Sequence, residues 1–109
     1  MPYDESLANR VRALLSRRSG LAEKKMFGGV GFLLGGNMCC AVWKQFLILR
    51  LGPHAHEHAL SQPGVREFDI TGRAMKGWVM VEPEETEKDQ SLKDWVRQAA
   101  LFAASLPAK

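Results

Sequence analysis

The sequence predicts an α+β fold in which helices flank an antiparallel sheet. Apolar residues recur at helical spacing near both ends of the chain, and extended apolar segments lie between these two regions. Short connections rich in Gly, Pro and Asn separate the extended segments, as is typical of tight turns. Taken in order, the elements are α-β-β-β-α-β-β-α, which favours a two-layer architecture.

Length and composition indicate one ordinary globular domain, residues 1–109. Of the 109 residues, 46% are apolar and 25% are charged, a balance that excludes disorder over most of the chain. The longest uncharged stretch, residues 26–43, holds five glycines and a turn, so we expect no membrane-spanning segment. Two cysteines are too few for a secreted domain held together by disulfides.

The first predicted helix spans residues 4–18 and is followed by Ser19-Gly20. Asp4 is suited to cap its N-terminal end. Its apolar side is defined by residues at helical spacing: Leu7, Val11, Leu14 and Leu15.

Three strands of an antiparallel meander are expected next. Residues 23–34 are extended, with glycines that indicate a bulge or bend. Gly35-Gly36-Asn37 predicts a hairpin turn, because these residues accept positive φ. The second and third strands span residues 38–43 and 46–51, with a short turn at Lys44-Gln45.

The remaining segments complete the predicted order. Pro53 suits a first helical turn, so residues 54–60 form a short helix. Strands follow at 65–70 and 78–81, joined by a loop at 71–77, and a solvated acidic connection runs to residue 89. The last helix, with Ser91 and Asp94 as a capping box and Pro107 as its end, carries one apolar stripe: Leu92, Trp95, Val96, Ala99, Phe102, Ala103 and Leu106.

The two central strands, residues 38–43 and 46–49, are apolar on both faces. A sheet with one solvated face would alternate apolar and polar residues. Either helices cover both faces, or a second subunit covers one of them. Since only two long helices are predicted, we expect a homodimer that buries part of the sheet; the alternative is that the short helix and the loops suffice.

The charge balance permits nucleic-acid binding without demanding it. There are 15 Lys and Arg against 12 Asp and Glu, a formal charge of +3. Arg17, Arg18, Lys24 and Lys25 form what we call the basic corner, which is the candidate for contacts with phosphates. No nucleic-acid-binding motif accompanies it, so the alternative is a solvated surface.

No cofactor and no physiological metal are expected. His54 and His58 share one face of the short helix, but no third ligand is identifiable by spacing. The adjacent Cys39 and Cys40 lie in an apolar strand, where their side chains would point to opposite faces and at least one would be buried. No catalytic constellation is recognisable, so we expect a protein that is not an enzyme.

Residues 69–78 form the most distinctive predicted loop. Its glycines permit tight turns, and its side chains offer both hydrogen-bond donors and apolar contacts. It is a candidate edge for a ligand or a partner; the alternative is a loop that closes over the core. The candidate residues are Thr71, Arg73, Met75, Lys76 and Trp78.

A succession of short motifs resembles the TfoX/Sxy N-terminal domain family. The motifs lie at residues 23–29, 36–38, 49–53, 68–73, 75–79 and 103–107, and the resemblance runs from about residue 3 to residue 109. It implies an antiparallel sheet with flanking helices, similar to the secretion-chaperone-like two-layer architecture. The family gives no established catalytic residues.

The resemblance also implies a function. The full-length members of the family regulate natural competence and genes controlled with the cyclic-AMP receptor protein, and they carry a second, C-terminal domain. We therefore expect a stand-alone N-terminal domain, regulatory and non-enzymatic, that acts through protein contacts with a partner. Direct weak nucleic-acid binding, or a small-molecule or metal-dependent activity, is the alternative. The N-terminal residues do not resemble a signal peptide, so we expect a cytoplasmic protein.

Overall fold

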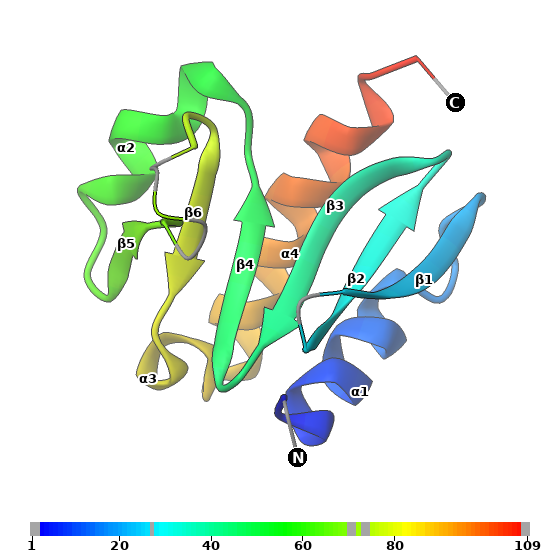
Figure 1. Ribbon diagram of the computed structural model, residues 1–109, viewed down its shortest axis with the longest axis horizontal. Coiled ribbons are helices and arrows are strands. Elements are labelled where there is room, and N and C mark those ends of the chain that lie inside the picture. The colour runs from blue at the N-terminus through cyan, green and yellow to red at the C-terminus, as the bar shows by residue number, and fades with distance from the viewer. Residues whose placement is uncertain (1–2, 27, 70–71, 73–74, 108–109) are drawn as a thin grey trace.

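The computed structural model describes residues 3–26, 28–69, 72 and 75–107. Its main element is a six-stranded sheet of order β1-β2-β3-β4-β6-β5, in which every neighbouring pair is antiparallel (Figure 1). The α+β class predicted from the sequence is confirmed. The strands are β1 (Leu21–Met26), β2 (Gly29–Leu34), β3 (Asn37–Trp43), β4 (Phe46–Arg50), β5 (Val65–Glu67) and β6 (Trp78–Val81).

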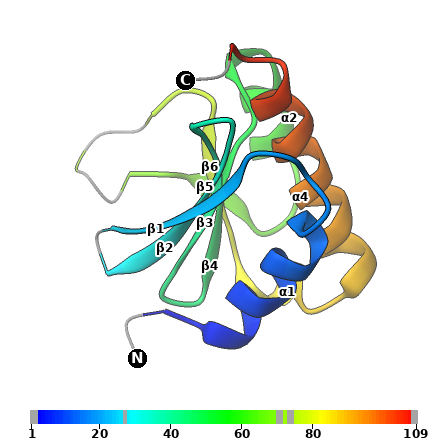
Figure 2. The ribbon, with the colours of Figure 1, turned by 90° about the vertical axis from the view of Figure 1, so that its right-hand side faces the viewer.

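The helices form a second layer on one side of the sheet. They are α1 (Glu5–Leu15), α2 (His56–Leu60), α3 (Pro83–Thr86) and α4 (Asp89–Ala104), with a short 3₁₀ turn, η1 (Pro53–Ala55), before α2. Figure 2 shows the sheet edge-on, with α1, α2 and α4 on the same side. Within the part of the chain that the structure describes, no helix covers the opposite side, which we call the open face.

The core lies between the sheet and this helical layer. The central strands β2, β3, β4 and β6 turn apolar side chains toward the helices, where they meet the apolar stripes of α1 and α4. Burying one such side chain contributes about 1.5–3 kcal/mol. From the sheet the core takes Val30, Phe32, Leu34, Cys39, Cys40, Val42, Leu47, Leu49, Val79 and Val81.

The segment expected to be one extended strand is two strands. β1 and β2 pair from Leu21↔Leu34 to Met26↔Gly29, so the meander has four strands rather than three. The chain reverses near Gly28, which has φ +79°, a conformation that favours glycine. Gly29 faces the backbone of β3 so closely that a Cβ atom there would overlap the Val42 carbonyl oxygen.

The ends of several helices also differ from expectation. Asp4 caps α1 as predicted, its Oδ1 accepting the Leu7 amide at 3.0 Å, but the helix ends at Leu15. The acidic connection contains α3, for which Pro83 supplies a preset first turn. Because α4 already begins at Asp89, Ser91 lies inside the helix and caps nothing.

A β-bulge in β3 decides where the two cysteines point. Phe32 pairs with Cys40 whereas Leu33 pairs with Met38, which leaves Cys39 as the extra residue. Cys39 and Cys40 are therefore both in the helix-side core and have no exposed surface. The expectation that they point to opposite faces is wrong, because strict alternation fails at a bulge.

None of the helices described here is long and apolar enough to span a membrane.

Candidate interaction surface

The open face is apolar along its centre. Residues that alternate with the core positions project from it, and the register aligns Ala41 of β3 with Ile48 of β4 and Met80 of β6. Ile48 and Met80 are each only 3% exposed, although neither belongs to the core on the helix side. The neighbouring apolar residues of this face are half-buried: Leu33, Met38, Ala41, Trp43 and Phe46.

Two aromatic rings lie side by side on this face. Trp43 and Phe46 are opposite one another in the β3–β4 register, and their ring centroids are 6.2 Å apart with an interplanar angle of 23°. Such offset stacking adds about 0.5–1.5 kcal/mol to the burial of the rings. It also gives the face a rigid aromatic feature.

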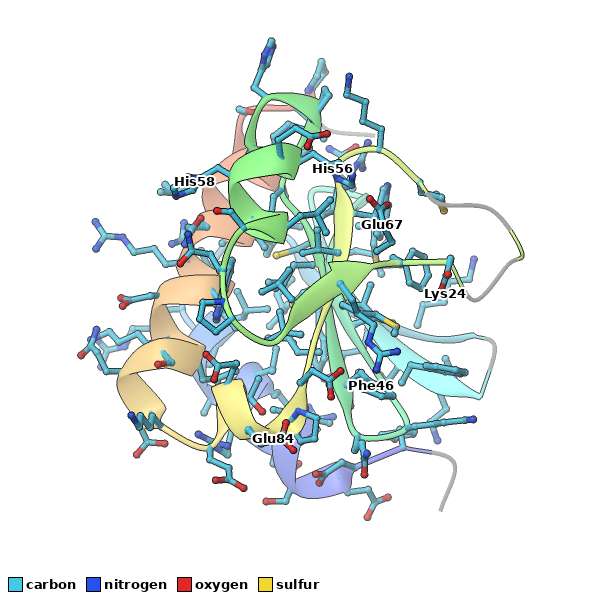
Figure 3. All side chains as sticks on the ribbon, turned by 90° about the vertical axis from the view of Figure 1, so that its left-hand side faces the viewer. Lys24, Phe46, His56, His58, Glu67 and Glu84 are labelled. Atoms are coloured by element: carbon cyan, nitrogen blue, oxygen red, sulfur yellow. The ribbon has the colours of Figure 1, made fainter. Side chains whose placement is uncertain are left out.

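Cations surround the aromatic pair. Lys44 Nζ is 4.6 Å from the Trp43 ring centroid, and the Arg66 guanidinium is 5.4 Å from that of Phe46. Arg66 also forms an ion pair with Glu82 at 2.7 Å. Lys24, seen with Phe46 on the open side in Figure 3, lies on the edge strand β1. The cations are therefore at the rim or are already neutralised, and the centre is uncharged.

The basic corner is not one continuous patch. Lys24 and Lys25 are consecutive in β1 and so project to opposite faces of the sheet. Arg17 and Arg18 follow the C-terminal end of α1. Between these two pairs, Arg12 makes two hydrogen bonds to Glu23, of 2.6 and 2.7 Å. The four cations expected to act together are thus divided by a neutralised ion pair and by the plane of the sheet.

The two histidines considered for a metal site are both exposed, whereas the one between them is buried. Among the described residues, no group of three or more His, Cys, Asp or Glu side chains is placed to hold a metal ion. His56 is 5% exposed. Its Nδ1 accepts the Gly77 amide at 2.9 Å, and its Nε2 is 3.2 Å from Glu67 Oε1 (Figure 3 labels both side chains).

Sequence reasoning missed the His56–Glu67 pair. Helical spacing identified His54 and His58 because they share a face, and it gave no sign that the residue between them meets β5. The only signal was the position of three histidines just after Pro53. Here His56 joins α2 to β5 and to the end of the 71–77 loop, which is a structural role.

The candidate loop is only partly described. Thr71 and Arg73 lie outside the described residues, and Met75 and Lys76 are exposed. Trp78 is half-buried: its ring centroid is 5.9 Å from that of Phe68, and the Arg50 guanidinium is 5.6 Å from it. Trp78 therefore packs against Phe68 and Arg50 at the C-terminal end of the loop.

The two buried thiols differ in their electrostatic surroundings. A hydrogen bond between them lowers the pKa of Cys39, and the positive charge of Arg18 lowers it further. The same hydrogen bond and complete burial raise the pKa of Cys40 well above its ordinary value. Because neither sulfur reaches solvent, both act as small core residues.

Comparison with known proteins identifies the family. A family model described as the TfoX N-terminal domain matches residues 13–103. The chain belongs to the TfoX N-terminal domain family. The match runs from the last turn of α1 to the last turn of α4, so all six strands, and with them the open face, lie within the part that matches the TfoX N-terminal domain. No curated protein and no solved structure gives a significant match.

Proposed function

We propose that this TfoX N-terminal domain is a non-enzymatic regulatory domain that acts in the cytoplasm through protein contacts made by its open face. The family supports a role in the regulation of competence and transcription. The partner that we propose first is a second copy of the chain, giving a homodimer.

The observation that carries this proposal is an apolar face of the sheet that no helix in the described part of the chain covers. All three longer helices lie on one side of the sheet, and the other side presents Trp43 and Phe46 beside the apolar row of Ala41, Ile48 and Met80. Ile48 and Met80 are only 3% exposed, so the half-buried residues around them provide the accessible apolar area of this face. An accessible apolar patch with a polar rim is typical of protein–protein contacts. Two such sheet faces can stack about 10 Å apart and exclude water between them.

The distribution of charge supports a second copy as the partner. In a two-fold pairing each open face meets itself, so a charged centre would repel its own image. Here the centre is uncharged, Arg66 is neutralised by Glu82, and Lys24 and Lys44 lie at the periphery. The rim charges can therefore stay solvated when two copies associate.

The proposal is tested by sedimentation velocity on three proteins. The unmodified chain is expected to sediment as a dimer at micromolar concentration, and Phe46→Glu as a monomer because it replaces an aromatic ring of the contact with a charged group. Leu101→Glu is the matched control, since Leu101 is an exposed apolar residue on the helical layer. It is expected to remain a dimer.

Circular dichroism of each variant separates loss of assembly from loss of fold. A folded Phe46→Glu that dimerises as strongly as Leu101→Glu would contradict the open face as the contact. An unmodified chain that is monomeric at about 100 μM would contradict the homodimer. The dissociation constant of the dimer would then exceed about 100 μM, which is weaker than an interface of standard size provides.

A further inference from the structure

A hollow lies between the C-terminal ends of the two long helices, away from the open face. Its volume is about 500 Å³, within the range of pockets that hold small molecules. We call it the helix-end hollow. It is lined by Arg17, Arg18, Ser19, Leu34, Gly35, Asn37, Ala103, Ala104 and Leu106.

Backbone and side-chain contacts hold the walls of the hollow in place. The Gly35 amide donates to the Gly20 carbonyl at 3.1 Å, which joins the β2–β3 turn to the segment after α1. The Asn37 side-chain amide donates to the Pro107 carbonyl at 2.9 Å, which joins the same turn to the segment after α4. Asn37 is 3% exposed, so this connection is a buried one.

Among the described residues, the charged side chains that line the hollow are those of Arg17 and Arg18, and no Asp or Glu of that part of the chain contributes to its wall. The arginines within α1 each hold a carboxylate, Arg10 that of Asp89 at 2.8 Å and Arg12 that of Glu23 at 2.6 Å. Arg17 and Arg18 hold none among the residues that the structure describes. Arg17 and Arg18 both line the hollow, and the N–H groups of a guanidinium match a carboxylate in pairs, so these side chains favour an anion there.

The helix ends do not oppose an anion as strongly as bare carbonyl groups would. A helix C-terminus attracts cations, which accounts for arginines at this place. The last carbonyls, however, are already hydrogen-bonded: Leu15 accepts from the Arg18 amide at 2.9 Å, and Ala103 accepts from the Leu106 amide at 3.2 Å. The positive side chains therefore decide the sign of the charge that the hollow prefers.

Part of the remaining lining is apolar, beside the polar Ser19 and Asn37. Leu34, Ala103 and Leu106 contribute aliphatic surface beside the arginines. A ligand that fits both parts has a charged head and a short hydrocarbon chain. Inorganic phosphate would satisfy only the arginines.

We propose that the helix-end hollow binds a small organic carboxylate that carries an aliphatic chain. Arg17 and Arg18 hold the carboxylate, and the leucine and alanine side chains contact the hydrocarbon part. Because the hollow lies on a different part of the molecule from the open face, this site is independent of the proposed homodimer.

The test is a titration of the isotope-labelled chain with hexanoate, followed by amide chemical shifts. Saturable shifts are expected at Ser19, Gly35 and Asn37, with a Kd of about 1 mM or below. Acetate, which lacks the chain, is expected to bind at least tenfold more weakly, since each buried methylene adds to affinity. Hexylamine, which reverses the charge, is expected to cause no such shifts.

Two variants locate the site. Arg17→Gln with Arg18→Gln is expected to weaken hexanoate binding at least tenfold, because the charge-assisted hydrogen bonds are lost. Ala104→Leu is expected to weaken it by filling the hollow without a change of charge. Lys24→Gln with Lys25→Gln is the matched control, with the same loss of charge in β1, and is expected to bind as the unmodified chain does.

Four results would overturn the proposal. The first is the absence of saturable shifts with hexanoate. The second is equal binding by the Arg17/Arg18 double variant when its spectrum shows a folded protein. The third is equal affinity for inorganic phosphate and hexanoate, which would indicate an unspecific anion site. The fourth is displacement of hexanoate by micromolar duplex DNA, which would assign the two arginines to nucleic acid.

Discussion

His56 is held in place by its surroundings. It is nearly inaccessible to solvent, and both ring nitrogens have partners in different parts of the chain. Since Nδ1 accepts the Gly77 amide, the ring proton is assigned to Nε2, which donates to Glu67. The second carboxylate oxygen of Glu67 is buried and has no hydrogen-bond partner among the described residues, so Glu67 relies on this imidazole.

Replacement of this imidazole is expected to destabilise the fold. In His56→Ala the Gly77 amide and the Glu67 carboxylate both lose a partner, at a cost of about 1–3 kcal/mol in the free energy of unfolding. Urea denaturation measures this cost. His58→Ala is the control, because His58 is exposed and is expected to change the stability by less than about 0.5 kcal/mol. Equal effects of the two substitutions would contradict the role assigned to His56.

At the scale of elements, α1 is fastened to the edge strand β1 by Arg12 and Glu23. Two short hydrogen bonds join the guanidinium to the carboxylate. The hydrogen bond with Arg12 is the main reason why the pKa of Glu23 lies below its ordinary value. Both side chains are partly exposed, so the pair is expected to contribute less than about 1 kcal/mol to stability.

This pair predicts a pH dependence of definite sign. Because the pKa of Glu23 is lower in the folded chain than in the unfolded one, the pair stabilises the fold above the ordinary carboxyl range. The stabilisation is lost as the pH falls through the lowered value. Glu23→Gln is therefore expected to be less stable than the unmodified chain at pH 7, with the difference closing below about pH 4. Thermal unfolding across this range measures it, with Glu57→Gln, an exposed carboxylate, as the control.

Local patterns predicted the elements that local interactions decide. The Asp4 cap and the apolar stripe of α4 depend on neighbours within four residues, and the structure has both. The split between β1 and β2 was missed because the glycines near residue 28 indicated a bend without showing that the chain reverses. The bulge at Cys39 is set by pairing with β2, which the sequence of β3 alone does not contain.

The candidate sites show the same limit. Lys24 and Lys25 are adjacent in sequence and were grouped with the arginines for that reason, although strand geometry separates them. No local pattern predicts the role of His56, because its partners, Glu67 and Gly77, are 11 and 21 residues away. Arg17 and Arg18 were predicted as a candidate site, but the hollow beside them requires the end of α4, far along the chain.

At the scale of the whole molecule, the layers are asymmetric. One side of the sheet is covered by helices that carry the chain's two apolar stripes, and the other side keeps its aromatic residues half-buried. Apolar residues on both faces of β3 and β4 were recognisable from the sequence. The sequence does not show which of the two faces the helices cover, because this follows from how α1 and α4 connect to the sheet.

The homodimer predicts that thermal stability depends on protein concentration. An assembly that must dissociate on unfolding gains stability by mass action, and a tenfold rise in concentration is expected to raise Tm by about 3–6 °C. Differential scanning calorimetry over two decades of concentration measures this shift. Phe46→Glu is expected to show a constant Tm over the same range, and a concentration-independent Tm of the unmodified chain would count against assembly.

The bulge in β3 has a consequence for changes in chain length. After Cys39, the side chains of Cys40 and Val42 point to the core and that of Ala41 points to the open face. Before Cys39, Asn37 lies on the helix side and Met38 on the open face. Removal of Cys39 would join these two stretches into one regular strand with every remaining side chain on its present face. Cys39 is thus the position at which β3 can lose a residue while Asn37 stays directed at Pro107.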